Sequence, residues 1–127
     1  MDPTALARQT AYGRIALGAA LAVAPGLAAR GWIGSASATP GARVLARGFG
    51  ARDVAIGAGA LMALNHGGPA RDWMLAGALA DFGDLAATLA AGRALPPLGR
   101  FGVAALATSG AVLSLWAARE LAAQLEP

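Results

Sequence analysis

Residues 101–118 contain no charged side chain, and this run restricts the folds open to the chain more than any other feature. A helix of about 18 to 20 apolar residues is long enough to cross the hydrocarbon core of a bilayer. The whole chain fits a lipid environment, because 57% of its 127 residues are hydrophobic and only 13% are charged, whereas soluble domains average about 25% charged residues. The sequence therefore predicts a multi-pass protein of the cell membrane.

Four apolar segments are separated by glycine- and proline-containing stretches, which are typical of loops. They predict helices near residues 11–29, 42–64, 71–92 and 98–124. Helices joined by short loops pack antiparallel, so we expect a single integral membrane domain over residues 1–127. Its predicted fold class is all-α, a four-helix antiparallel transmembrane bundle. The first three segments can span only if their charged side chains are accommodated.

Two other interpretations of the apolar segments remain open. The basic N-terminal stretch, a short apolar run and the small residues 22–24 imitate a secretory signal with a cleavage site. Alanine-rich helices also form the cores of soluble four-helix proteins, although residues 101–118 offer no polar face to water. In the membrane interpretation, Arg14 and Arg30 bracket the first apolar run and extend outward to the lipid headgroups.

Small residues recur about four positions apart in three of the segments. Such rows allow helix backbones to approach closely in lipid, where there is little hydrophobic drive for association. The predicted packing rows are Gly18, Ala22 and Gly26 in the first segment, Gly50, Asp53 and Gly57 in the second, with Gly48 and Gly59 on a neighbouring stripe, and Gly77, Asp81, Asp84 and Thr88 in the third.

Five ionisable residues are predicted to converge in depth. At a rise of about 1.5 Å per residue, Asp53 and Asp81 lie near the midplane of the hairpin formed by the second and third segments. Arg52 and Asp84 lie within about one turn of them, and Arg47 lies about two turns from Asp53. A charge near the bilayer centre costs about 2.5 to 3.5 kcal/mol, so this cluster is the predicted functional centre.

The simplest interpretation of this cluster is an internal salt-bridge network, since guanidinium groups pair well with carboxylates. Two arginines face three aspartates, so at least one carboxyl is expected to lack a partner and to be open to protonation. Arg47, Arg52 and Asp53 are therefore candidate ligand-binding residues. The leading functional interpretation is a site that binds a small lipophilic ligand or a proton within the bundle.

Two alternatives remain. Asp81 and Asp84 lie three residues apart on one helical face, which suits acid and base catalysis. The chain could therefore be an intramembrane enzyme, such as a hydrolase, isomerase or cyclase, acting on a lipophilic substrate. In the other alternative the charges hold together an assembly, either a homo-oligomer or a complex with another membrane subunit. The sequence leaves open whether the protein is an enzyme.

Cofactors, metals and nucleic acid are not expected as partners. The chain has no cysteine and a single histidine, His66, so it cannot build the common thiolate or imidazole metal sites. Its net charge of +3 comes from arginines scattered between apolar runs, whereas binding a phosphate backbone needs clustered cations. The lipid bilayer is the expected partner.

The charged segments also carry a resemblance to a known group of proteins. The run ARGFGARDVAIG at residues 46–57 precedes Arg-Asp-Trp at 71–73 and Ala-Asp-Phe-Gly-Asp at 80–84. With these Gly-x-Arg-Asp and Asp-x-Gly-Asp elements, the chain resembles small four-helix bacterial integral membrane proteins of unassigned function. The resemblance implies a four-helix membrane fold, points to the same charged residues and implies no activity.

Overall fold

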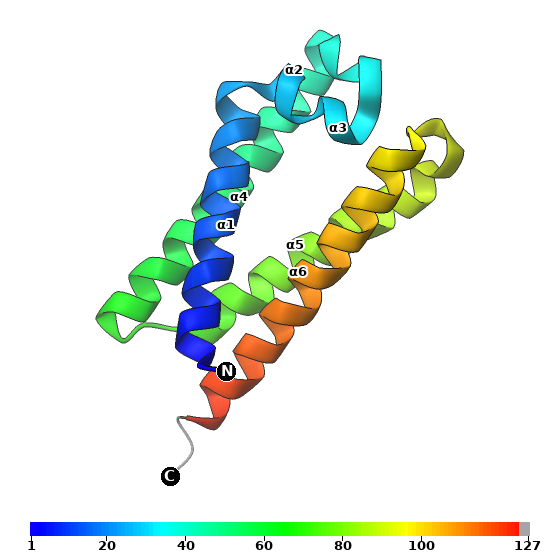
Figure 1. Cartoon of the computed structure of the whole chain (residues 1–127). Coiled ribbons are helices and arrows are strands. Elements are labelled where there is room, and N and C mark those ends of the chain that lie inside the picture. The colour runs from blue at the N-terminus through cyan, green and yellow to red at the C-terminus, as the bar shows by residue number, and fades with distance from the viewer. Residues whose placement is uncertain (125–127) are drawn as a thin grey trace.

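The computed structural model describes residues 1–124, which form helices joined by short turns (Figure 1). No strand occurs within these residues, so the all-α prediction is confirmed. The four long helices are α1 (Pro3–Val23), α4 (Pro40–His66), α5 (Ala70–Ala91) and α6 (Pro97–Ala123). The shorter elements are α2 (Pro25–Ala28), α3 (Arg30–Ile33), and two 3-10 helices, η1 (Gly34–Ala38) and η2 (Gly92–Ala94).

Helix α1 differs most from its predicted range of residues 11–29. It begins at Pro3, because the Asp2 side chain accepts a hydrogen bond from the backbone N–H of Thr4 at 2.9 Å and proline suits the first helical turn. It ends at Val23, since Pro25 disfavours helical backbone at the residue before it. The earlier start and end move the middle of α1 from residue 20 to residue 13, next to Arg14.

The other three long helices lie within two residues of their predicted ranges. Helix α4 begins at Pro40, where the Thr39 hydroxyl accepts a hydrogen bond from the Ala42 N–H at 3.3 Å. It ends at His66 and is capped by Gly67, whose φ of 69° is a left-handed conformation that glycine adopts without strain. Proline at the first position of α6 marks its start in the same way.

The long helices form two antiparallel pairs (Figure 1). Helix α1 packs along α4, and α5 packs along α6. The pairs meet at the end of the bundle where α1 begins, through a shared cluster of buried side chains from all four helices. They diverge toward the other end, where α3 folds back to contact the start of α6.

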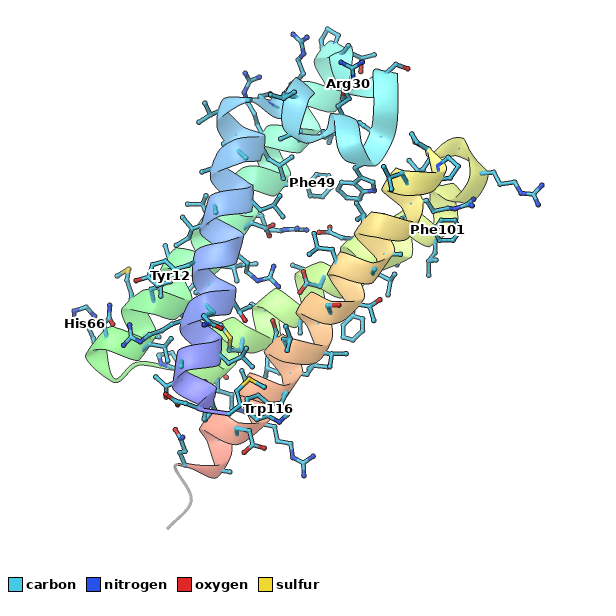
Figure 2. All side chains as sticks on the ribbon, in the orientation of Figure 1. Tyr12, Arg30, Phe49, His66, Phe101 and Trp116 are labelled. Atoms are coloured by element: carbon cyan, nitrogen blue, oxygen red, sulfur yellow. The ribbon has the colours of Figure 1, made fainter. Side chains whose placement is uncertain are left out.

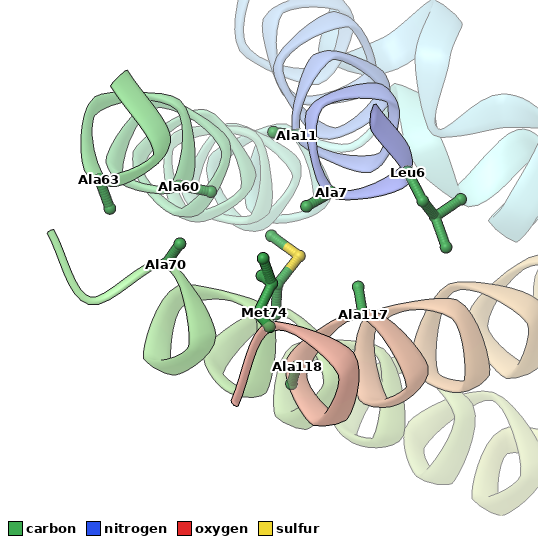
Figure 3. Packing of buried hydrophobic residues seen from close by; sticks show 10 residues of the cluster. Leu6, Ala7, Ala11, Ala60, Ala63, Ala70, Met74, Ala117 and Ala118 are labelled. Atoms are coloured by element: carbon green, nitrogen blue, oxygen red, sulfur yellow. The ribbon is translucent and has the colours of Figure 1, made fainter. Parts of the chain in front are cut away.

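Small side chains fill the core where the two pairs meet (Figure 3). Ala7, Ala11, Ala60 and Ala117 are buried there around Met74. Many large apolar side chains lie on the outside instead, and exposed examples in α5 and α6 are Leu79 (73%), Leu89 (62%) and Leu106 (60%). The helices are therefore held together by close backbone approach, with their bulky side chains directed to the surroundings.

Glycines set the spacing of α1 and α4. A Cβ atom added to Gly18 would lie 2.5 Å from the carbonyl oxygen of Gly50, and one added to Gly50 would lie 2.5 Å from that of Gly18. Further along, a Cβ at Gly57 would lie 2.6 Å from the Ala11 carbonyl oxygen. The predicted packing role of these glycines is confirmed, whereas Gly48 on the neighbouring stripe has open space around it.

Two helical stretches within residues 1–124 are long and apolar enough to cross a membrane, Ala70–Ala94 and Pro97–Ala123. Helix α4 is as long as α6 but carries three arginines and Asp53, and α1 carries two arginines. Length and composition therefore support membrane spanning for two stretches, one formed by α5 with the residues up to Ala94 and one formed by α6. The sequence had predicted four spans.

Candidate functional site

Arg14 in the middle of α1 is the centre of the charged network. Its side chain is buried, and it donates a hydrogen bond to the Gly77 carbonyl oxygen at 2.8 Å and another to the Asp81 carboxylate. It also forms an ion pair with Asp53 at 3.5 Å. The expectation that Arg14 extends outward to the headgroups is wrong, because the helix begins eight residues earlier than predicted and Arg14 is not at its end.

Arg52 on α4 is the second cation of the network. Its guanidinium donates to both oxygens of Asp84 on α5, at 2.9 and 2.7 Å. It also donates to Asp53 through Nε at 3.2 Å and through a terminal nitrogen at 3.1 Å. Four of the five donor hydrogens that a guanidinium carries are therefore engaged, and the two-oxygen contact with Asp84 is the strong, directional type.

The two arginines join three helices in one chain of ion pairs. It runs from Asp81 to Arg14, on to Asp53, then to Arg52 and Asp84. No carboxylate of the network lacks a cation, contrary to the expectation of an unpaired acid, because Asp53 is shared between both arginines. The network nevertheless contains three acids and only two bases.

The structure brings together four of the five predicted site residues and replaces the fifth. Arg52, Asp53, Asp81 and Asp84 are in the network, whereas Arg47 is exposed and forms no ion pair with any residue from 1 to 124. Arg14 takes its place. Depth alone had suggested Arg47, but its side chain leaves α4 on another side of the helix.

Two glycines make room for the network. A Cβ atom at Gly77 of α5 would lie 2.9 Å from Nε of Arg14, and one at Gly110 of α6 would lie 2.6 Å from a carboxylate oxygen of Asp81. Arg14, Asp53, Asp81 and Gly110 each lie near the middle of their helices. All four long helices thus contribute to one level of the bundle, although α6 does so only by leaving space. The sequence carried no signal for Gly110.

Aromatic and hydroxyl groups continue the network toward the diverging end. The Arg52 guanidinium lies over the Phe49 ring, 5.1 Å from its centroid, and the Phe49 and Trp32 ring centroids are 5.9 Å apart. The indole N–H of Trp32 donates to the Thr88 hydroxyl at 3.2 Å, which itself donates to the Asp84 backbone carbonyl at 2.7 Å. Trp32 is half-buried, and this hydrogen bond ties the segment between α1 and α4 to α5.

A partly open cavity of about 240 Å³ adjoins these groups. Phe49, Trp32 and Thr88 form the wall nearest the network, and Figure 2 shows Phe49 directed from α4 into the space between the two helix pairs. The remaining wall is apolar, with residues of α1, α3, α4, α5 and the turn before α6: Leu21, Ala29, Ile33, Ala42, Leu45, Ala46, Ala87, Ala91 and Leu95.

This arrangement favours binding over acid-base chemistry. Asp81 and Asp84, the candidate catalytic pair, are held by different arginines, and no hydrogen bond joins them. Within the described residues no group of three or more metal-ligating side chains comes together. His66 lies at the exposed end of α4, where a ring nitrogen contacts the Met62 carbonyl oxygen at 2.9 Å.

Comparison with known proteins adds no assignment to this geometry: no family model, no curated protein and no solved structure matches the chain.

Proposed function

We propose that this chain is an integral membrane protein whose four long helices cross the bilayer, and that it binds a small lipophilic ligand in the cavity beside the Arg52–Asp84 pair. The proposal rests on one observation: an apolar cavity of about 240 Å³ lies next to a charged network at the middle of the bundle. Binding sites are typically apolar recesses with a few placed polar groups, and this cavity has that composition.

The membrane placement is supported by where the charges and the large apolar side chains lie. The charged groups at mid-depth are paired with one another, as charges within a bilayer require. Arg43 and Arg47 of α4 lie within about two turns of its start, from where long side chains reach the headgroups. Leucines such as Leu79 and Leu106 project outward, which suits lipid better than water. A four-helix bundle is also what the resemblance to small bacterial membrane proteins implies.

The chemistry of the cavity wall favours an apolar ligand. The polar groups that line it, on Trp32 and Thr88, are bonded to each other, and the Thr88 hydroxyl also bonds to α5 backbone. The volume lies just below the lower limit of about 300 Å³ for drug-sized pockets and above an engineered apolar cavity of about 150 Å³ that binds benzene. We therefore expect a small aromatic or short-chain molecule, or one alkyl chain of a larger ligand.

The alternatives receive less support. A site built around one unpaired carboxyl receives less support, because all three carboxylates contact guanidinium groups. An acid-base enzyme would use Asp81 and Asp84 together on one substrate, but these residues serve separate ion pairs. An accessory subunit would use its charges toward another protein, whereas those of the network are paired with one another within residues 1–124.

Filling the cavity from α5 is expected to weaken ligand binding at least about tenfold. Ala87 lines the cavity, so Ala87→Leu should occupy its volume, whereas the adjacent Ala86 is exposed and does not line it. Purified protein carrying Trp73→Phe and Trp116→Phe retains Trp32 as its only tryptophan. In this background, iodobenzene should quench Trp32 fluorescence in a saturable manner, with affinity lowered at least about tenfold by Ala87→Leu and unchanged by Ala86→Leu. The same linear, non-saturating quenching in all three proteins would rule out the cavity as a binding site.

A further inference from the structure

We propose a second site, at the end of the bundle where α5 begins and α6 ends, that binds the headgroup of an anionic phospholipid. A groove of about 420 Å³ lies there between the two helices. Arg71 and Leu75 line it from α5, and Leu115, Ala118 and Arg119 line it from α6. The inference rests on the membrane placement proposed above, but it uses neither the apolar cavity nor the charged network.

The order of residues along the groove matches a lipid entering from the membrane surface. Arg71 and Leu75 are one turn apart on α5, and Arg119 and Leu115 are one turn apart on α6. Because the helices run antiparallel, the two arginines lie at the outer level and the two leucines one turn closer to the middle. The small side chain of Ala118 is buried at the floor. A phosphate can therefore meet the arginines while its acyl chain lies against the leucines.

Both guanidinium groups are available to an incoming phosphate. Arg71 contacts Asp72 at 3.3 Å, but both side chains are more than half exposed, at 51% and 66%, and exposed pairs of this kind contribute little. Arg119 is exposed and forms no ion pair within residues 1–124. Two planar guanidinium groups can each donate two hydrogen bonds to phosphate oxygens, and basic pockets between membrane helices bind lipid headgroups by this chemistry.

The opposite end of the same two helices supplies a matched control. Arg93 follows α5 and Arg100 lies in the first turn of α6. The guanidinium of Arg100 lies over its neighbour Phe101, 4.6 Å from the ring centroid. Removing this pair changes the net charge by the same amount as removing Arg71 and Arg119, so it separates a local site from general attraction of a positive protein to an anionic lipid.

Native mass spectrometry of the full chain in neutral detergent tests the site, with phosphatidylglycerol and phosphatidylcholine added at equal concentration. We expect the wild type to retain one phosphatidylglycerol in preference to phosphatidylcholine. Arg71→Gln/Arg119→Gln should lower that retention at least about tenfold, each single variant should lower it partly, and Arg93→Gln/Arg100→Gln should leave it unchanged. A tenfold loss is an effect of the size expected for two charge-assisted contacts.

Three results would overturn the proposal. The first is that Arg71→Gln/Arg119→Gln retains as much phosphatidylglycerol as the wild type. The second is that Arg93→Gln/Arg100→Gln loses as much of it as Arg71→Gln/Arg119→Gln. The third is that millimolar inorganic phosphate displaces the lipid, which would indicate a site for free phosphate. The single variants cover the case in which the double variant does not fold. None of these results bears on the Trp32 quenching experiment, so the failure of this site and the failure of the ligand cavity can be distinguished.

Discussion

Replacing Arg14 by glutamine is expected to lower the free energy of unfolding by about 3 to 5 kcal/mol, the range found when one partner of a buried ion pair is removed. The side chain of Arg14 is 8% exposed, and among the described residues it is the cation in contact with Asp81. Glutamine would leave Asp81 buried beside a neutral group and would leave Asp53 with Arg52 alone. The effect can be measured by unfolding the protein with SDS in mixed micelles.

Two further variants isolate the cause of that loss. Arg47→Gln removes an arginine of α4 that is exposed and outside the network, and it should change stability by less than about 0.5 kcal/mol. Adding Asp81→Asn to Arg14→Gln removes the uncompensated carboxylate, so the double variant should recover part of the lost stability. If Arg14→Gln unfolds at the same SDS fraction as Arg47→Gln, the network does not hold the helices together.

Replacing Gly50 by alanine is expected to destabilise the bundle by about 1 to 3 kcal/mol, the usual range for overpacking. The new Cβ would lie 2.5 Å from the Gly18 carbonyl oxygen and 2.8 Å from the Ala22 nitrogen. Both are backbone atoms, so no side chain can rotate away and α1 must move relative to α4. That movement would also separate Arg14 from Asp53, which adds to the loss.

Gly48→Ala is the matched control on the same helix, because a Cβ there has no neighbour within 4 Å. It should stabilise the protein by up to about 1 kcal/mol, since alanine is the better helix former. The two alanine variants are thus expected to shift the SDS unfolding midpoint in opposite directions. Equal shifts in the same direction would show that Gly50 does not lie at a close helix contact.

The sequence predicted three of the four long helices well, and α1 poorly. Prolines at the starts of α4 and α6 and glycine at the end of α4 marked these boundaries, so the ranges agreed within two residues. Counting residues from both ends of the second and third segments also placed Asp53 and Asp81 at the same depth. In the structure both residues pair with Arg14. Arg14 was predicted to lie near a helix end because the predicted range began at residue 11, whereas the Asp2 cap starts α1 at Pro3.

Arg47 was wrongly assigned to the network because depth was considered without direction around the helix. At about 100° per residue, Arg47 lies about 120° around α4 from Asp53. The buried face of α4 instead follows Ala46, Gly50, Asp53 and Gly57. Arg52 is also off this face, but its long side chain reaches around to Asp53 and across to α5.

The cavity could not be predicted from the local sequence. It exists because Pro25 ends α1 and lets α3 fold back over the diverging end of the bundle, which brings Trp32 to Thr88, 56 positions along the chain. A contact between residues so far apart cannot be predicted from the residue pattern of a single segment. The pairing of every carboxylate likewise depends on three helices meeting at once. A count of acids and bases predicted one unpaired carboxylate, but in the structure Asp53 is shared by Arg14 and Arg52, and each of the three carboxylates has a partner.

Cysteine labelling of intact cells tests most directly whether all four long helices cross the membrane. The chain has no cysteine of its own, and four exposed positions each report one loop or end: Ser35→Cys, His66→Cys, Ala94→Cys and Gln124→Cys. With four spans, positions 35 and 94 should react with a membrane-impermeant maleimide on one side of the membrane, and positions 66 and 124 on the other. If position 35 reacts on the same side as 66 and 124, only α5 and α6 cross, and the four-span bundle with its network at mid-membrane is contradicted.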